Sequence, residues 1–260
     1  MKAKKSFGQH FLNDESIAER IADSISASES DSVLEIGPGQ GMLTKYLLKK
    51  PYTFMAVEAD RDMISYLNEA YPDIQGKLIA DDVLKVRLEQ HFDGEFYIIG
   101  NFPYNISSQI LFKAIKYRDR VPELVGMFQK EVAERVVSKP GSKVYGVISV
   151  LIQAFYEGEY LFTVERGSFS PPPKVRSAVI RLRRIREELD DGMQYSDFRM
   201  VVKTAFNQRR KMLRNTLKPL FKNTPDILTE ELFIQRPEQL SVDQFFYLTK
   251  KYVAARDLEV

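Results

Sequence analysis

Short apolar runs alternate with segments of helical period along most of the chain from Ser32 onward. The helical segments repeat their apolar residues every three or four positions, whereas the short runs are continuous. Seven runs are predicted to be strands: residues 33–36, 54–58, 78–80, 96–99, 124–128, 160–164 and 178–182. Helices are predicted over residues 42–50, 61–70 and 147–154 and through 132–136. This alternation predicts an α/β fold, in which helices cover a mostly parallel seven-stranded sheet.

The pattern changes after the last predicted strand. Residues 186–192 are polar and end in a glycine, which is typical of a linker. Beyond them Val202, Phe206 and Leu213 recur at spacings near three, four and seven, which predicts helices. We therefore expect two domains, an α/β domain over residues 1–187 and a small all-helical domain over residues 188–260.

The composition narrows the possible functions. The chain is 44% hydrophobic and 28% charged, as in a globular protein with a sizeable core. It has no cysteine, and its two histidines, His10 and His91, are far apart, so we expect no metal site. The basic start is not followed by an apolar segment, and no run reaches the length of a membrane span. We expect a cytoplasmic protein that does not associate with membranes.

Positive charge is concentrated in one window. Residues 195–222 hold eight Lys and Arg and one acidic residue, although the whole chain carries a net charge of only +2. Such asymmetry favours a polyanionic partner. A solvated helix face would have the same composition, so charge alone leaves both interpretations open.

A glycine-rich turn follows the first predicted strand. Residues 35–41 read Glu-Ile-Gly-Pro-Gly-Gln-Gly, with Gly37 and Gly39 between the strand and the next helix. Glycine lets the backbone turn tightly and approach a ligand closely. The spacing departs from the dinucleotide fingerprint, because the third glycine comes one position early. The alternative is a glycine turn with a purely structural role.

Acidic residues follow the next two strands. Glu58 ends the second predicted strand, where a carboxylate can accept both ribose hydroxyls of an adenosine-containing cofactor. Asp81 and Asp82 follow the third strand, where a carboxylate can accept a hydrogen bond from an adenine amino group. The alternative is that either aspartate only caps the next turn.

The fourth strand ends in the most specific motif, Asn101-Phe102-Pro103-Tyr104. An adenine amino group is a poor nucleophile, because its lone pair is delocalised into the ring. Two acceptors, the Asn101 side-chain oxygen and a backbone carbonyl near Pro103, would hold its hydrogens and localise that lone pair. Tyr104 can stack on the base. Transfer would then depend on positioning more than on a strong base. The alternative is a plain proline turn.

Together these motifs resemble the ribosomal RNA adenine N6,N6-dimethyltransferases, from Lys5 to about Tyr247. The resemblance includes an opening motif over residues 7–12, Phe-Gly-Gln-His-Phe-Leu. It implies a Rossmann-like class I S-adenosylmethionine-dependent methyltransferase fold, with S-adenosyl-L-methionine as cofactor. The cofactor contacts that the resemblance and the motifs predict are His10, Leu12, Gly37, Gly39, Glu58, Asp82 and Asn101. The family more often has leucine at Phe102, and many members have asparagine at His10.

Two C-terminal segments resemble the small-subunit branch of that family. They are residues 205–215, which contain Arg-Arg-Lys, and residues 236–241, Arg-Pro-Glu-Gln-Leu-Ser. The resemblance implies that the basic window, residues 195–222, contacts RNA phosphates. The residues predicted to bind RNA are Arg209, Arg210, Lys211, Arg214 and Lys218. It further implies that two adjacent adenosines near the 3′ end of small-subunit RNA each receive two methyl groups.

Three alternatives compete with this hypothesis. The same chemistry on large-subunit RNA is disfavoured by the C-terminal segments. A role chiefly as an assembly factor on immature small ribosomal subunits is compatible with the motifs. A NAD enzyme is disfavoured by the glycine spacing and by the loop at Asn101. We expect a monomer that acts on small-subunit RNA.

Overall fold

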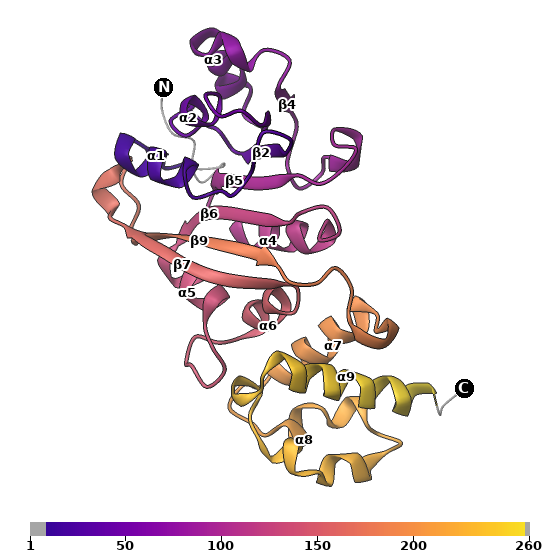
Figure 1. Cartoon of the computed structure of the whole chain (residues 1–260). Helices are drawn as coiled ribbons and strands as arrows, with labels where there is room; N and C mark the ends of the chain where they lie inside the picture. Colours follow the sequence, from indigo (N-terminus) through magenta and orange to yellow (C-terminus); the bar gives the residue numbers. More distant parts are fainter. Residues whose placement is uncertain (1–8, 258–260) are drawn as a thin grey trace. The chain divides into compact units, whose positions relative to one another are not determined.

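A computed structural model of the chain describes residues 9–257, without the side chain of Asp191 (Figure 1). Lys5, Phe7 and Gly8, which belong to the predicted resemblance, lie outside the described residues. Contacts divide the chain into two compact units. One holds the residues up to Ala133 together with Glu157–Ile185, and the other holds Glu134–Tyr156 together with the residues from Arg186 onward.

The large sheet belongs to the α/β fold that the sequence predicts. Its strands, in spatial order, are β4 (Leu78–Ala80), β3 (Thr53–Glu58), β2 (Ser32–Ile36), β5 (Tyr97–Asn101), β6 (Glu123–Gln129), β9 (Ser177–Arg184) and β7 (Tyr156–Val164). The strands from β4 to β6 are parallel, and β9 pairs antiparallel with β6. The predicted mostly parallel, seven-stranded sheet is therefore confirmed.

The strand order reverses at the centre of the sheet. The chain moves outward from β2 to β3 and β4, and then returns to place β5 on the other side of β2. Loops from the carboxyl ends of β2 and β5 consequently diverge and leave a crevice between them, where ligands bind in sheets of this kind.

The helices of the first unit are α1 (Glu15–Ala22), α2 (Thr44–Leu47), α3 (Arg61–Ala70), α4 (Ser107–Lys116) and the start of α5 (Lys130–Val137). Buried residues of α1, α2 and α3 form one core with side chains of the sheet, among them Ile21, Leu47 and Leu67. The last four residues of β2 are all buried, as expected for a central strand covered on both faces. This packing holds the carboxyl end of β2 rigidly beside the crevice.

The predicted helix over residues 42–50 is shorter in the structure. The α2 helix spans only Thr44–Leu47, and Lys49 and Lys50 close a tighter turn through bonds to the carbonyls of Tyr46 and Leu47. A helix was not predicted over residues 15–22, although Asp14 accepts hydrogen bonds from the backbone of Ser16 and Ile17 and so caps α1.

The second unit contains α6 (Val147–Gln153), α7 (Tyr195–Phe206), α8 (Leu213–Thr216), α9 (Val242–Asp257) and several short 3-10 turns. Aromatic pairs form part of its core: the ring centroids of Phe198 and Phe246 lie 5.0 Å apart, and those of Phe206 and Phe245 lie 5.8 Å apart. The break before Arg186 lies close to the predicted boundary after residue 187, whereas the sequence did not indicate that residues 134–156 group with this unit. No helix among residues 9–257 is long and apolar enough to cross a membrane.

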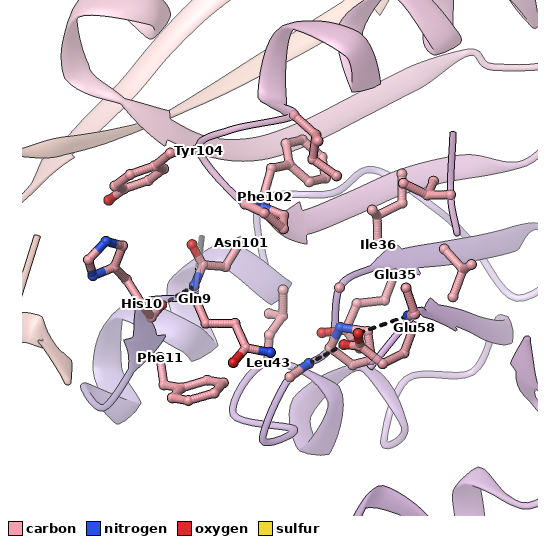
Figure 2. Close-up of a pocket in the computed structure, with 18 of the residues that line it drawn as sticks. Gln9, His10, Phe11, Glu35, Ile36, Leu43, Glu58, Asn101, Phe102 and Tyr104 are labelled. Atoms are coloured by element: carbon pink, nitrogen blue, oxygen red, sulfur yellow. Dashed lines mark hydrogen bonds between the residues drawn. The ribbon is translucent and has the colours of Figure 1, made fainter. Parts of the chain in front are cut away.

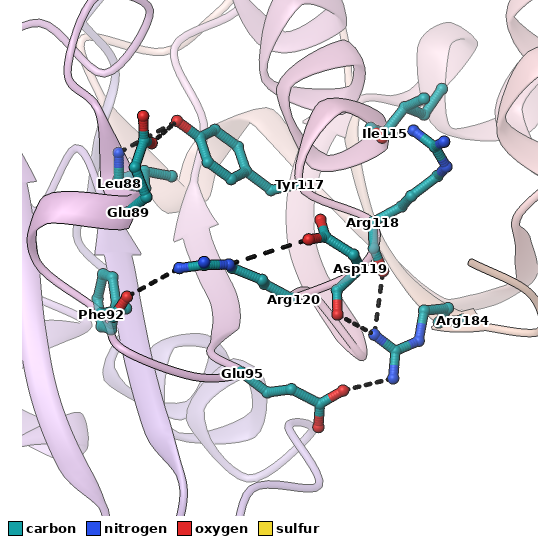
Figure 3. Close-up of polar contacts among 10 residues, drawn as sticks. All are labelled: Leu88, Glu89, Phe92, Glu95, Ile115, Tyr117, Arg118, Asp119, Arg120 and Arg184. Atoms are coloured by element: carbon teal, nitrogen blue, oxygen red, sulfur yellow. Dashed lines mark hydrogen bonds and ion pairs between the residues drawn. The ribbon is translucent and has the colours of Figure 1, made fainter. Parts of the chain in front are cut away.

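Arg184 ties the amino-terminal edge of the large sheet together (Figure 3). Its Nη1 donates to the carbonyls of Arg118 at 3.0 Å and Asp119 at 3.1 Å, and its Nη2 contacts the carboxylate of Glu95. The Arg184 side chain is 16% exposed, whereas that of Glu95 is 53% exposed. Because solvent weakens the ion pair, the backbone carbonyls are the more important partners.

We predict that Arg184→Met lowers the free energy of unfolding by about 1–3 kcal/mol, because two carbonyls lose a charged donor. Urea denaturation measures this effect. Glu95→Gln is the control, and it should cost less than about 1 kcal/mol because the ion pair is exposed. Equal losses in the two variants would contradict the importance of the carbonyl contacts.

Candidate active site

A cavity of about 280 Å³ opens at the carboxyl ends of the central strands. The residues predicted to bind the cofactor or to act in catalysis all line it: His10, Leu12, Gly37, Gly39, Glu58, Asp82, Asn101, Pro103 and Tyr104. The topology brings them together because β2, β3, β4 and β5 end at the same edge of the sheet. Their individual roles stay predictions.

Glu58 lies at the end of β3, and it is 8% exposed. Its Oε1 accepts from the backbone N–H groups of Ala59 and Asp60, both at 2.9 Å, and its Oε2 accepts from Gly39 at 3.2 Å (Figure 2). Burial raises the pKa of Glu58, and these three hydrogen bonds oppose the increase. Since Oε2 has a single backbone donor, it keeps the capacity to accept from a hydroxyl group.

Gly39 has a φ of 55°, a conformation that suits glycine, and it points its N–H at Glu58. A Cβ at this position would lie 3.3 Å from the ring of Phe11, so the turn and the N-terminal segment approach each other closely. The glycine turn therefore shapes the cavity wall and also holds the acidic residue opposite. These features fit a compact adenosine-containing cofactor.

A second acidic residue in the cavity was not predicted to be functional. Glu35 in β2 is 1% exposed, and burial raises its pKa to about 8, against the effect of a 2.7 Å hydrogen bond from the hydroxyl of Thr44. The signal available in the sequence was its place in a strand that is otherwise apolar, directly before the glycine turn.

Asp82 is half-buried in the loop after β4. Its Oδ1 accepts from the N–H of Leu84 at 2.9 Å, and its Oδ2 lies 3.8 Å from the Nζ of Lys85. The capping role considered as an alternative is thus present. It is compatible with a ligand contact, because a carboxylate can accept several hydrogen bonds.

Asn101 is oriented by the N-terminal segment. Its Nδ2 donates to the carbonyl oxygen of His10 at 3.2 Å (Figure 2). A carbonyl only accepts hydrogen bonds, so the amide must present its NH₂ group to His10. Its Oδ1 therefore points away from that carbonyl, toward the side of the cavity on which Tyr104 lies (Figure 2).

A two-stranded sheet holds that segment in place. In it β1 (Phe11–Leu12) pairs antiparallel with β8 (Phe169–Ser170). Next to this sheet, Nδ1 of His10 lies 2.9 Å from the carbonyl oxygen of Pro171, which requires the proton to be on that nitrogen. The imidazole packs beside the ring of Tyr104, with 5.3 Å between centroids, and Leu12 packs into the core.

Tyr104 is half-buried, and its hydroxyl is hydrogen bonded to the hydroxyl of Ser177. Burial raises the pKa of Tyr104, so the phenol is neutral near neutral pH. The ring is therefore held at its hydroxyl by Ser177 and along its side by His10. Ser177 was not singled out in the sequence, because it lies 73 positions from Tyr104.

The buried ring of Phe102, within the catalytic motif, acts as a wedge that fills the space left open at Gly126. It is 1% exposed, and its ring packs edge-on against Phe128 with 5.1 Å between centroids. A Cβ at Gly126 would lie 2.2 Å from Cε2 of Phe102, so the large ring fits only because that position has no side chain. The unusual phenylalanine is thus matched by a glycine on the neighbouring strand.

The basic residues predicted to bind RNA lie in the second unit. The α7 helix ends at Phe206, and Arg210 and Lys211 lie in the turn before α8. The predicted helical pattern is therefore divided between two helices, with a turn between Phe206 and Leu213. Arg210 and Lys211 are exposed, as are Arg214 in α8 and Lys218 in the following turn.

Arg209 differs from the other basic residues. It is half-buried, and its Nη2 donates to the carbonyl oxygen of Ser142 at 3.1 Å. The sequence could not distinguish it from Arg210, since both are arginines in the same polar segment.

Two solved structures that resemble this chain are methyltransferases. A dimethyladenosine transferase from Plasmodium falciparum matches with a TM-score of 0.79 and 25% identity, over 95% of this chain and 98% of that one. The 23S rRNA methyltransferase ErmE matches in fold with a TM-score of 0.70 and 24% identity, over 93% and 99% of the two chains. The fold and the cavity define a Rossmann-like S-adenosylmethionine-dependent methyltransferase.

Sequence comparison identifies the family. Residues 1–254 match the family described as ribosomal RNA adenine dimethylase. A protein of Flavobacterium johnsoniae called ribosomal RNA small subunit methyltransferase A is 54% identical over 98% of this chain and 97% of its own length. A protein of the same name from Parabacteroides distasonis is 53% identical over 96% and 93%. The chain belongs to the ribosomal RNA adenine dimethylase family, and the predicted resemblance to its small-subunit branch is confirmed.

We predict that Gly126→Ala lowers the free energy of unfolding by about 1–3 kcal/mol and reduces methyl transfer, because the new methyl group would displace Phe102 next to Asn101. Phe102→Leu should suppress much of this effect, since leucine lacks the ring edge that lies over Gly126. Urea denaturation of both single variants and the double variant measures the coupling. If Gly126→Ala costs the same in both backgrounds, the wedge interpretation is wrong.

Proposed function

We propose that this chain uses S-adenosyl-L-methionine to dimethylate the N6 amino groups of two adjacent adenosines near the 3′ end of small-subunit ribosomal RNA. The observation that carries the proposal is the orientation of Asn101, whose amide oxygen faces the same cavity that Glu58 lines. Membership of the ribosomal RNA adenine dimethylase family supports the choice of substrate class.

When bound, the cofactor supplies an electrophilic methyl group on a sulfonium. Glu58 would accept a ribose hydroxyl, and Asp82 would accept from the adenine end of the cofactor. Asn101 Oδ1 and a carbonyl near Pro103 would accept the two hydrogens of the target amino group, and Tyr104 would stack on its base. A paired adenosine must leave its stack to enter such a cavity. The contribution of these residues is to position the target and to localise its lone pair.

The proposed partner is the RNA of the small ribosomal subunit, free or within an immature subunit, on which the protein acts in the cytoplasm as a monomer and without a metal ion. The relatives named for the ribosomal RNA of the small subunit support this partner. The exposed basic residues near α8 would contact the phosphate backbone.

Transfer of labelled methyl groups to unmethylated small-subunit particles tests the proposal, with large-subunit RNA as the parallel substrate. Nucleoside analysis should find dimethyladenosine only in the small-subunit RNA. Label in large-subunit RNA would contradict the proposed substrate. Tight binding of particles without label in either RNA would instead favour an assembly role.

We predict that Asn101→Ala keeps the dissociation constant of the cofactor within a factor of about ten, because one hydrogen-bond partner among several is lost. Methyl transfer should fall by about 10²-fold or more, since the amide oxygen faces the target amino group. Cofactor titration and turnover measure the two effects separately. Asn68→Ala, on the exposed side of α3, is the control. Normal turnover in Asn101→Ala would refute the catalytic assignment.

We also predict that reversing the charge of Arg210, Lys211 and Arg214 weakens RNA binding and reduces its salt dependence. The variant would contact fewer phosphates, so fewer counterions would be released on binding. Titration of RNA at several salt concentrations gives the slope. An unchanged slope would mean that these side chains are only solvated.

A further inference from the structure

A second basic segment lies in the same unit as the predicted RNA-binding residues. The loop between α5 and α6 (Figure 1) carries Lys139 and Lys143 on either side of Pro140-Gly141-Ser142. Both lysines are exposed. The charge pattern of the sequence did not reveal this loop, because two lysines among neutral residues form no charge run.

The loop is attached to the basic turn that follows α7. Arg209, in that turn, donates from Nη2 to the carbonyl oxygen of Ser142 at 3.1 Å. A guanidinium cannot reach that carbonyl unless the loop and the turn are neighbours. Lys143 is adjacent in sequence to Ser142, and Arg210 is adjacent to Arg209. The two exposed basic segments therefore lie side by side.

Two further contacts fix the loop. The N–H of Gly141 donates to the carbonyl oxygen of Glu238 at 2.7 Å, and Glu238 belongs to the Arg-Pro-Glu-Gln-Leu-Ser segment. Tyr145 is fully buried, and its ring lies 6.4 Å from that of Phe206, the last residue of α7. The loop is thus anchored before and after Ser142, so its lysines extend from an ordered backbone.

The exposed cations on this surface lack acidic partners in the part of the chain that the structure describes. Across the described residues, 9–257, no carboxylate forms an ion pair with Lys139, Lys143, Arg210 or Lys211. Like charges gathered in this way repel one another, and a polyanion relieves the repulsion. An RNA backbone carries successive negative phosphates. Two neighbouring basic segments can contact several of these phosphates at once.

We propose that the loop at Lys139–Lys143 and the turn at Arg209–Lys211 form one composite surface that binds the phosphate backbone of the substrate RNA. Within it Arg209 is a positioning residue, which holds the loop through Ser142 while Lys139 and Lys143 contact phosphates. The inference rests on the proposed function, because it takes ribosomal RNA as the polyanion.

The test compares two variants with the same loss of charge. Lys139→Gln with Lys143→Gln removes the loop cations, and Lys49→Gln with Lys116→Gln removes two exposed cations from the first unit. Binding of small-subunit RNA is measured between about 50 and 200 mM salt. The slope of log affinity against log salt should fall by about two for the loop variant and stay unchanged for the control. An unchanged slope in the loop variant, or equal changes in both, would overturn the composite surface.

A measurement on the RNA-free protein separates a positioning role of Arg209 from direct contact with a phosphate. Arg209→Met should increase hydrogen exchange at the amides of Lys139 and residues 141–143 in the RNA-free protein, because the Ser142 carbonyl loses its donor. In that background the two loop substitutions should reduce RNA affinity less than they do in the wild type. Unchanged exchange in this loop would refute the positioning role.

Different results would contradict the composite surface and the proposed function. If wild-type protein methylates small-subunit RNA and the loop variant binds it with the wild-type salt slope, the composite surface alone is wrong. If wild-type protein neither binds nor methylates that RNA, the proposed function itself is wrong.

Discussion

The hydrogen bond from the Asn101 amide to the His10 carbonyl is the contact on which the geometry of the site depends. An amide that rotated freely could present either its oxygen or its NH₂ group to a target amine, and only the oxygen can accept the amine's hydrogens. The 3.2 Å contact to an obligate acceptor selects one of these orientations. It can do so only if the segment that carries His10 is fixed, and the pairing of β1 with β8 provides this.

Residues behind the site also restrict the position of the catalytic motif. Phe102 fills space that Gly126 leaves open, and it belongs to the short segment that carries Asn101 and Tyr104. Packing in a protein interior tolerates little change in volume, so the wedge limits how far that segment can shift. Tyr104 is restrained in turn by Ser177 and His10. Hydrogen bonds therefore set the direction of the polar groups, and close packing sets their position.

The sequence predicted the features that depend on local pattern. The strands β2 and β3 are mostly apolar runs, and Glu58 and Asn101 at the strand ends could be expected to meet because parallel strands end at one edge. The two-residue strands β1 and β8 have no periodicity to detect. The contact between His10 and Asn101 joins residues 91 positions apart. Arg209 differs from the arginine next to it only through its contact with Ser142, which lies far away in the sequence. Such features depend on tertiary packing, which local pattern does not encode.

Two glutamates that line the cavity, Glu35 and Glu58, are both buried but differ in their hydrogen-bond donors. Burial raises the pKa of both Glu35 and Glu58, and the charge of Glu58 further raises that of Glu35. Glu58 receives three backbone N–H donors, which favour its charged form, whereas within residues 9–257 Glu35 accepts from one donor, the hydroxyl of Thr44. With a pKa of about 8, Glu35 is mostly protonated at neutral pH. The backbone donors therefore favour the charged form of Glu58, which the glycine turn contacts directly.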